Sequence, residues 1–218
     1  MFQGFSPETF DFLWGIRLNN EKTWFEAHKK DYVEYLYEPM KALGQAVFEG
    51  FTEAPAMELK VSRIYKDARM HPPVPYKESL WLCIRRSVQD WARHPTLYFE
   101  IRPEGASWGF ILYQPTATAM ESFRQGVKAN PKHLVKLLEN AQKESGLTFT
   151  AQCYKRPKPC DDPELLPYYS WKGVLAAERF AEPGEELFTP ELAETVKKQL
   201  LPWVPVCDYF YNFTLEQG

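Results

Sequence analysis

The segment from Arg63 to Lys77 carries more chemistry than a packed core needs. Its candidate ligand-binding residues combine three cations, two phenols and one carboxylate, and they are Arg63, Tyr65, Asp67, Arg69, Tyr76 and Lys77. Guanidinium and ammonium groups are the usual partners of phosphates and carboxylates in proteins. A single aspartate among them pairs with and orients one arginine, which leaves the other cations available. The segment therefore indicates a site for a small anionic ligand.

Strand alternation predicts how these side chains are presented. Alternate residues of a strand share a face, so Arg63 and Tyr65 continue the face that begins with Met57 and Leu59 as the core side. Charged groups that point inward are costly unless they are paired or open to a cleft. The prolines that follow require an extended turn, after which Tyr76 and Lys77 return close in sequence.

A structural interpretation of the same residues stays open. Clusters of arginine, aspartate and tyrosine also tie a strand end to a loop, and structural ion-pair networks are common. The protein would then be a non-catalytic interaction module that uses exposed aromatics such as Trp24, Phe25 or Trp203. The two interpretations differ in where the arginine that Asp67 does not bind should point. A ligand site requires its guanidinium to point into open, solvent-filled volume. Whether the chain is an enzyme is open, and Asp67 or a phenol is the expected proton carrier if it is one.

Period-two patterns predict the strands that position this segment. They cover residues 57–69, 80–88, 96–102 and 107–114, followed by 147–156 and 174–180. Connections among the first four are short, whereas a parallel crossover needs a dozen or more residues. We therefore expect a mainly antiparallel sheet of about five or six strands.

Helical spacing and end signals predict the covering elements. Helices are expected at 7–18, 22–48, 118–129 and 131–143, with a last one from Thr189, and the aromatic tail Tyr209, Phe210 and Phe213 should return to the core. Pro39 should kink or divide the second helix. Either Asn19 or Asn20 is expected to cap it. The fold class is thus α+β, and the absence of a linker or repeat predicts a single domain over residues 1–218.

Composition narrows the function classes. The chain has 218 residues and a net charge of −3, without a long basic run, which disfavours a nucleic-acid partner. No uninterrupted apolar run reaches membrane length and the N-terminus does not look like a signal, so we expect a cytoplasmic protein that does not associate with membranes. The four cysteines and four histidines show no ligand spacing. We therefore expect no metal and no other cofactor.

Several short motifs together resemble a known family. They are Phe2-Gln3-Gly4-Phe5, Phe12-Leu13, Asn19-Asn20, Lys22, Trp24-Phe25, Tyr32, the run from Arg63 to Arg69, Pro75-Tyr76-Lys77, the strand from Tyr98 to Arg102, Gly109 and Arg124. The chain resembles the domain-of-unknown-function family 2461 over nearly its whole length. That family carries a serine and an extra lysine where this chain has Met70 to Val74. It has no established activity, so the resemblance implies the boundaries and the motif but no reaction.

Overall fold

The computed structural model describes residues 1–52, 54, 56–66, 74–156 and 158–215. In this part of the chain one antiparallel sheet contains six strands in the order β1-β2-β3-β4-β6-β5. The strands are β1 (Met57–Val61), β2 (Leu80–Arg86), β3 (Thr96–Arg102), β4 (Gly105–Leu112), β5 (Phe149–Cys153) and β6 (Trp171–Ala181). With its helices, the chain has the predicted α+β class.

Two compact units divide the chain. The first comprises Met1–Ile84, Tyr98–Trp108 and Phe180–Lys197, and the second comprises Arg85–Leu97, Gly109–Arg179 and Lys198–Gly218. The candidate segment from Arg63 to Lys77 belongs to the first unit. The single domain stays a prediction.

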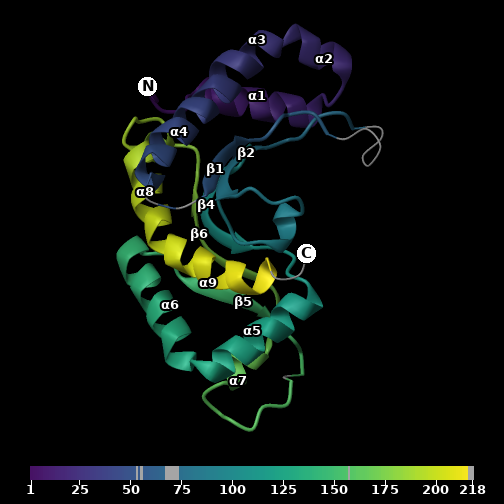
Figure 1. Ribbon diagram of the computed structural model, residues 1–218. Helices are drawn as coiled ribbons and strands as arrows, with labels where there is room; N and C mark the ends of the chain where they lie inside the picture. Colours follow the sequence, from purple (N-terminus) through teal and green to yellow (C-terminus); the bar gives the residue numbers. More distant parts are fainter. Residues whose placement is uncertain (53, 55, 67–73, 157, 216–218) are drawn as a thin grey trace. The chain divides into compact units, whose positions relative to one another are not determined.

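The first unit begins with a set of helices that lie together (Figure 1). They are α1 (Pro7–Leu18), α2 (Lys22–Ala27), α3 (Lys29–Asp31), the π-helical segment η1 (Tyr32–Tyr37) and α4 (Glu38–Phe48), followed by the 3-10 turn η2 (Glu49–Phe51). The predicted helix over 22–48 is thus divided before Pro39. Proline has no N–H to donate to the carbonyl of Tyr35. The Thr9 hydroxyl of α1 donates to that carbonyl at 2.6 Å, so a hydrogen bond joins α1 to the chain where the predicted helix is divided.

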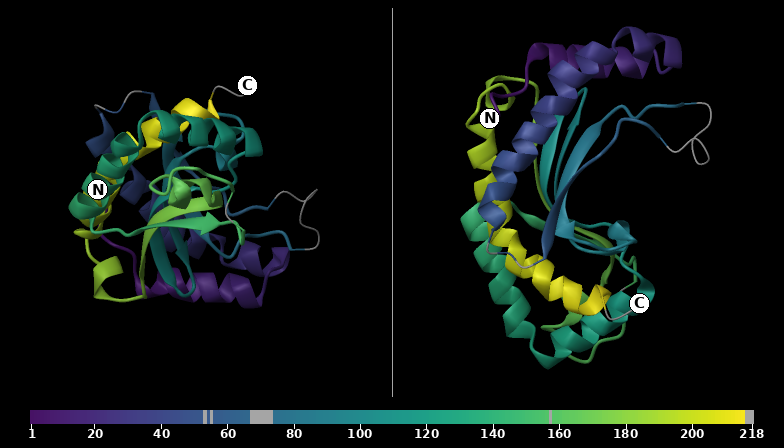
Figure 2. Two further views of the ribbon diagram at one scale, coloured as in Figure 1. Left: turned by 90° about the horizontal axis from the view of Figure 1, so that it is seen from below. Right: turned by 45° about the horizontal axis from the view of Figure 1, so that its top comes forward.

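The face of α4 that carries Leu43 and Val47 is buried in the first unit, where α4 lies against β1 (Figure 2). Gly44 permits this approach, because a Cβ there would lie 3.2 Å from the Leu59 side chain. After β6 the chain adds the short turn η4 (Glu185–Leu187) and reaches α8 (Leu192–Leu200). The predicted last helix therefore begins three residues after Thr189.

The second unit has its own aromatic core. Its further elements are η3 (Trp91–Arg93), α5 (Ala117–Ala129), α6 (Pro131–Ser145), α7 (Leu166–Tyr169), η5 (Leu201–Trp203) and α9 (Val204–Thr214). Helix α9 packs against both α5 and α6 (Figure 1). Phe210 and Tyr209 are buried and the Phe213 ring lies 6.0 Å from that of Phe123, so the predicted return of the tail is confirmed. None of the helices in the described ranges is both long and apolar enough to span a bilayer.

Candidate functional site

The candidate segment forms a short two-stranded ladder beyond β1 and β2. Tyr65 and Tyr76 are antiparallel bridge partners, and the chain on either side of the grey trace runs side by side (Figure 2). The Lys66 amide donates to Pro75 at 2.9 Å, and the Lys77 amide donates to Ile64 at 2.7 Å. The ladder therefore brings Arg63 and Tyr65 together with Tyr76 and Lys77. Asp67 and Arg69 lie outside the described residues.

The face predicted to continue the core is not the buried one beyond β1. The Ser62 amide donates to the Trp81 carbonyl at 2.7 Å, and the Trp81 amide donates to the Ser62 hydroxyl at 3.0 Å. Strand β1 ends at Val61, and Ser62 directly after it is buried. Ile64 is then fully buried, while Arg63 and Tyr65 are exposed. The prediction that Arg63 and Tyr65 continue the core face is thus wrong.

Asn20 clamps the returning chain of the ladder. Its side-chain nitrogen donates to the Tyr76 carbonyl at 3.0 Å, and its side-chain oxygen accepts from the Tyr76 amide, also at 3.0 Å. The prediction that an asparagine caps α2 is wrong, because the N-cap residue of α2 is Glu21. A side-chain amide that pairs with both backbone groups of one residue fixes its position like an additional strand. Asn20 is therefore a positioning residue, a role for which the sequence indicated only a helix cap.

Aromatic rings pack against the two tyrosines of the ladder. The Phe25 ring stacks on that of Tyr76 with centroids 4.2 Å apart, and it also contacts the rings of Tyr32 and Tyr65. Burial raises the pKa values of the Tyr76 and Tyr32 phenols. Both are therefore protonated at neutral pH, which suits them to donate a hydrogen bond and does not favour either as a general base.

Lys77 has a backbone carbonyl but no described carboxylate as a partner. Its ammonium group donates to the Arg63 carbonyl at 2.7 Å and lies 5.6 Å from the centroid of the Trp81 ring. Burial lowers the pKa of Lys77. Among the described residues no carboxylate forms an ion pair with Lys77 or with Arg63. Two cations of the predicted site are thus present without counter-charges in the described part of the chain.

Glu78, which follows Lys77 in sequence, and Glu100 on β3 are engaged by other groups. Glu78 accepts from Arg17 Nε at 2.8 Å, and Arg17 also pairs with Glu104. Glu100 on β3 accepts from the Ser79 hydroxyl at 2.7 Å. Glu78 therefore pairs with Arg17 rather than with the neighbouring Lys77.

Arg124, which carries part of the family resemblance, has a different environment in the second unit. Its side chain is 1% exposed, and its guanidinium donates to the carbonyl of Trp171 at 2.8 Å and to that of Tyr169 at 3.4 Å. It also pairs with Glu121 at 3.2 Å. These contacts hold the start of β6 against α5. Arg124 is therefore a structural cation whose three guanidinium nitrogens all bind protein groups.

The aromatics proposed for an interaction surface are mostly internal. Phe25 and Trp203 are fully buried, so the prediction that they are exposed is wrong. Trp24 is half-buried and its ring stacks on that of His28 at 4.0 Å. The large aromatics that are exposed include Trp14, Tyr65, Trp91 and Tyr113, of which only Tyr65 belongs to the ladder.

A family model described as a conserved hypothetical protein, DUF2461, matches residues 8–209. The chain belongs to this family. The match includes both the ladder and Arg124, so the predicted resemblance is confirmed over most of the chain. A search of curated proteins found no match. The family description names no activity, and the function must be argued from the site itself.

Proposed function

We propose that this protein is a cytosolic domain that binds a small phosphate- or carboxylate-bearing ligand through Arg63 and Lys77. The observation that carries the proposal is Lys77, a half-buried residue whose ammonium has no carboxylate partner among the described residues. Buried charges in proteins are usually paired, because an unpaired one loses hydration without compensation. An anion that binds beside Lys77 supplies the missing counter-charge.

The geometry supports binding rather than proton transfer. Lys77 uses one ammonium donor on the Arg63 carbonyl, and an ammonium has three. The Arg63 guanidinium is exposed and makes no ion pair with a described residue, so its planar set of donors is available to a carboxylate or phosphate. The buried phenol of Tyr76 is held neutral. The described ladder thus offers cations and neutral donors, which bind an anion without requiring a reaction.

Calorimetric titration with pyrophosphate and citrate tests this proposal. We expect both Arg63→Ala and Lys77→Met to weaken binding of the preferred anion by about tenfold, the scale of one charge-assisted hydrogen bond. Lys60→Met is the matched control, because Lys60 lies on β1 and is already paired with Glu58 at 3.0 Å. Unchanged affinity in both site variants, or equal loss in the control, would contradict the proposal.

A further inference from the structure

A pocket of about 350 Å³ lies wholly within the second unit, where helix α6 and the chain around the start of α7 line it. A pocket of this volume can hold a small organic molecule. The lining residues used below are Lys132, Val135, Lys136, Glu139, Glu164 and Tyr168. We call this the α6 pocket, and none of its residues belongs to the ladder.

One stripe of α6 forms much of the pocket wall. The four lining residues from this helix recur at the spacing i, i+3, i+4 and i+7, which places them on one face. The core face of α6 instead carries Leu134, Leu138 and Ala141. Glu164, before α7, and Tyr168, within α7, complete the wall. The tertiary fold thus brings two segments about 30 residues apart around one space.

The α6 pocket presents two lysines and two glutamates that have no protein counter-charges. None of the four forms an ion pair with a described residue. Lys132 and Lys136 are four residues apart on the helix, and like charges at this spacing repel each other. Elsewhere in the same unit, Glu121 pairs with both Arg124 and Lys158. The charges of the α6 pocket are therefore available to a ligand.

Tyr168 supplies an apolar surface and a neutral donor. The residue is half-buried, and its ring meets that of Trp171 edge-on with centroids 5.1 Å apart. Burial raises the pKa of the Tyr168 phenol, and the Glu139 carboxylate raises it further, so the phenol is protonated at neutral pH. Its hydroxyl makes no hydrogen bond to a described residue. Tyr168 can therefore donate to a carboxylate while its ring contacts an apolar group.

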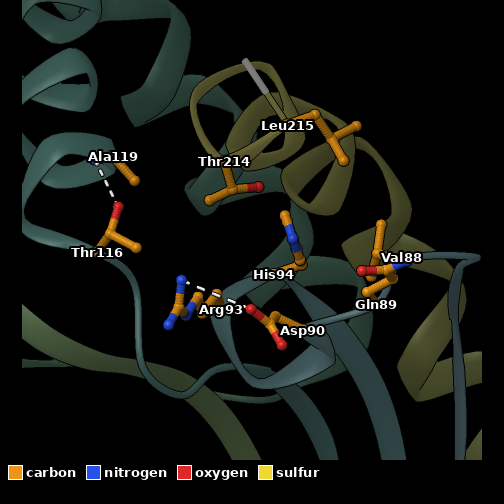
Figure 3. Close-up of a pocket in the computed structure, with 9 residues that line it drawn as sticks. All are labelled: Val88, Gln89, Asp90, Arg93, His94, Thr116, Ala119, Thr214 and Leu215. Carbon is orange, nitrogen blue, oxygen red and sulfur yellow. Dashed lines mark hydrogen bonds and ion pairs between the residues drawn. The ribbon is translucent and has the colours of Figure 1, made fainter. Parts of the chain in front are cut away.

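The pocket drawn in Figure 3 differs in this respect. It is lined by residues around η3, at the start of α5 and at the end of α9. Arg93 and Asp90 pair with each other there at 3.5 Å. The Thr214 hydroxyl and Nδ1 of His94 are shielded from solvent. Its charged pair is thus already compensated, whereas the charges of the α6 pocket are not.

Mixed charge restricts the class of ligand that fits the α6 pocket. A simple anion would meet two carboxylates and a simple cation would meet two ammonium groups, and like charges placed together are unfavourable. We infer that the α6 pocket binds a small zwitterion of the amino-acid class. The ligand carboxylate pairs with the two lysines and its ammonium with the two glutamates, while its side chain packs against Val135 and the ring of Tyr168. This site is separate from the Arg63 ladder and does not depend on the function proposed for it.

Calorimetric titration of the full chain with L-phenylalanine, 3-phenylpropionate and phenethylamine tests the inference. The three probes share one ring, but the second lacks the ammonium and the third lacks the carboxylate. We expect L-phenylalanine to bind and each analogue to bind at least about fivefold more weakly, the scale of an exposed ion pair. An analogue that binds as tightly as L-phenylalanine overturns the inference, as does the absence of L-phenylalanine binding at roughly 10 mM, the limit of weak affinity.

Two double variants should change the preference for these probes in opposite directions. Lys132→Gln/Lys136→Gln should weaken L-phenylalanine binding by about fivefold, and phenethylamine should bind as tightly as to the parent or more tightly, because its ammonium no longer meets two cations. Glu139→Gln/Glu164→Gln should weaken L-phenylalanine similarly and spare 3-phenylpropionate. All four side chains are exposed, so both variants should fold, and either one decides the case alone.

A matched control lies on the same helix. Lys143 and Glu144 are exposed on α6 and do not line the pocket, so Lys143→Gln/Glu144→Gln should leave the affinity for L-phenylalanine unchanged. Equal weakening in this control, or unchanged affinity in both pocket variants, overturns the inference. Loss of binding only in Arg63→Ala/Lys77→Met overturns it as well and assigns the probe to the ladder.

Discussion

Arg124 and the pair Arg63 and Lys77 are cations in one chain with opposite environments. Arg124 is almost completely buried, and backbone carbonyls and Glu121 occupy its guanidinium. Arg63 is exposed, and Lys77 is half-buried with one carbonyl partner. Both regions lie within the family match. The comparison shows that a cation characteristic of a family is a binding candidate only after its protein partners have been identified.

Replacement of Arg124 should give the largest effect. We expect Arg124→Met to lower the free energy of unfolding by about 3 kcal/mol, because the Trp171 and Tyr169 carbonyls lose a buried donor. Urea unfolding measures the change. Arg156→Met, at an exposed position of the same unit, should change it by less than about 0.5 kcal/mol. Similar small changes in both would remove the contrast with Arg63.

Asn20 tests whether the ladder needs its clamp. Asn20→Ala removes both hydrogen bonds to the Tyr76 backbone and should cost about 1–2 kcal/mol in urea unfolding. Asn19→Ala is the neighbouring control, since Asn19 contributes one exposed side-chain bond to the Gly15 carbonyl, and it should cost about 0.5 kcal/mol. A larger loss for Asn19→Ala would show that the clamp does not stabilise the ladder.

The effect of Lys77 on the free energy of unfolding should depend on pH. The pKa of Lys77 is lowered in the folded protein, so the folded chain binds fewer protons than the unfolded chain between that lowered pKa and the ordinary lysine pKa of 10.5. Below this pH window the charged Lys77 ammonium destabilises the folded protein by its full amount. The free energy of unfolding rises as pH increases through the window. Lys77→Met should therefore be at least as stable as the parent at pH 7, and the advantage should shrink toward pH 10. Urea unfolding of both proteins across this range measures the difference. A variant less stable than the parent by over about 1 kcal/mol at pH 7 would indicate a structural lysine.

Arg63 should give the smallest effect. We expect Arg63→Ala to change the free energy of unfolding by less than about 1 kcal/mol, because the side chain is exposed and has no ion-pair partner among the described residues. The sequence predicts such a small change for at least one of Arg63 and Arg69, and Arg69 lies outside the described residues. Thermal and urea unfolding measure it. A loss of about 3 kcal/mol, as expected for Arg124, would make Arg63 a structural residue and contradict the anion site.

Much of the fold follows from local patterns. The strand predicted over 96–102 is observed as β3 (Thr96–Arg102), and the helix predicted over 131–143 as α6 (Pro131–Ser145). Alternation and helix-end residues specify such elements without distant contacts. The π-helical segment before Pro39 was not predicted, because its stability involves a hydroxyl from Thr9, 26 residues away from its acceptor at Tyr35.

The candidate site was less predictable for the same reason. Composition located the cations, but alternation alone did not predict that Ile64, rather than Arg63, is the buried side chain beyond β1. No period-two pattern reports such a change. Thr214 of α9 is distant in sequence from the adjacent residues Arg93 and His94, and only the tertiary fold places all three around one pocket. Their chemistry could not be recognised from spacing.

The strand order has a consequence for how the chain folds during synthesis. Strands β1 to β4 are consecutive neighbours, so they can pair as they emerge, but the partner that completes the other side of β4 is β6 rather than β5. Two long helices and β5 are made before β6 appears. Until then, the outer side of β4 presents unpaired backbone groups, and such an edge invites pairing with another nascent chain. Because loops this long close slowly, the arrival of β6 should be the late step of folding, and the preceding interval is when a chaperone would protect the chain most.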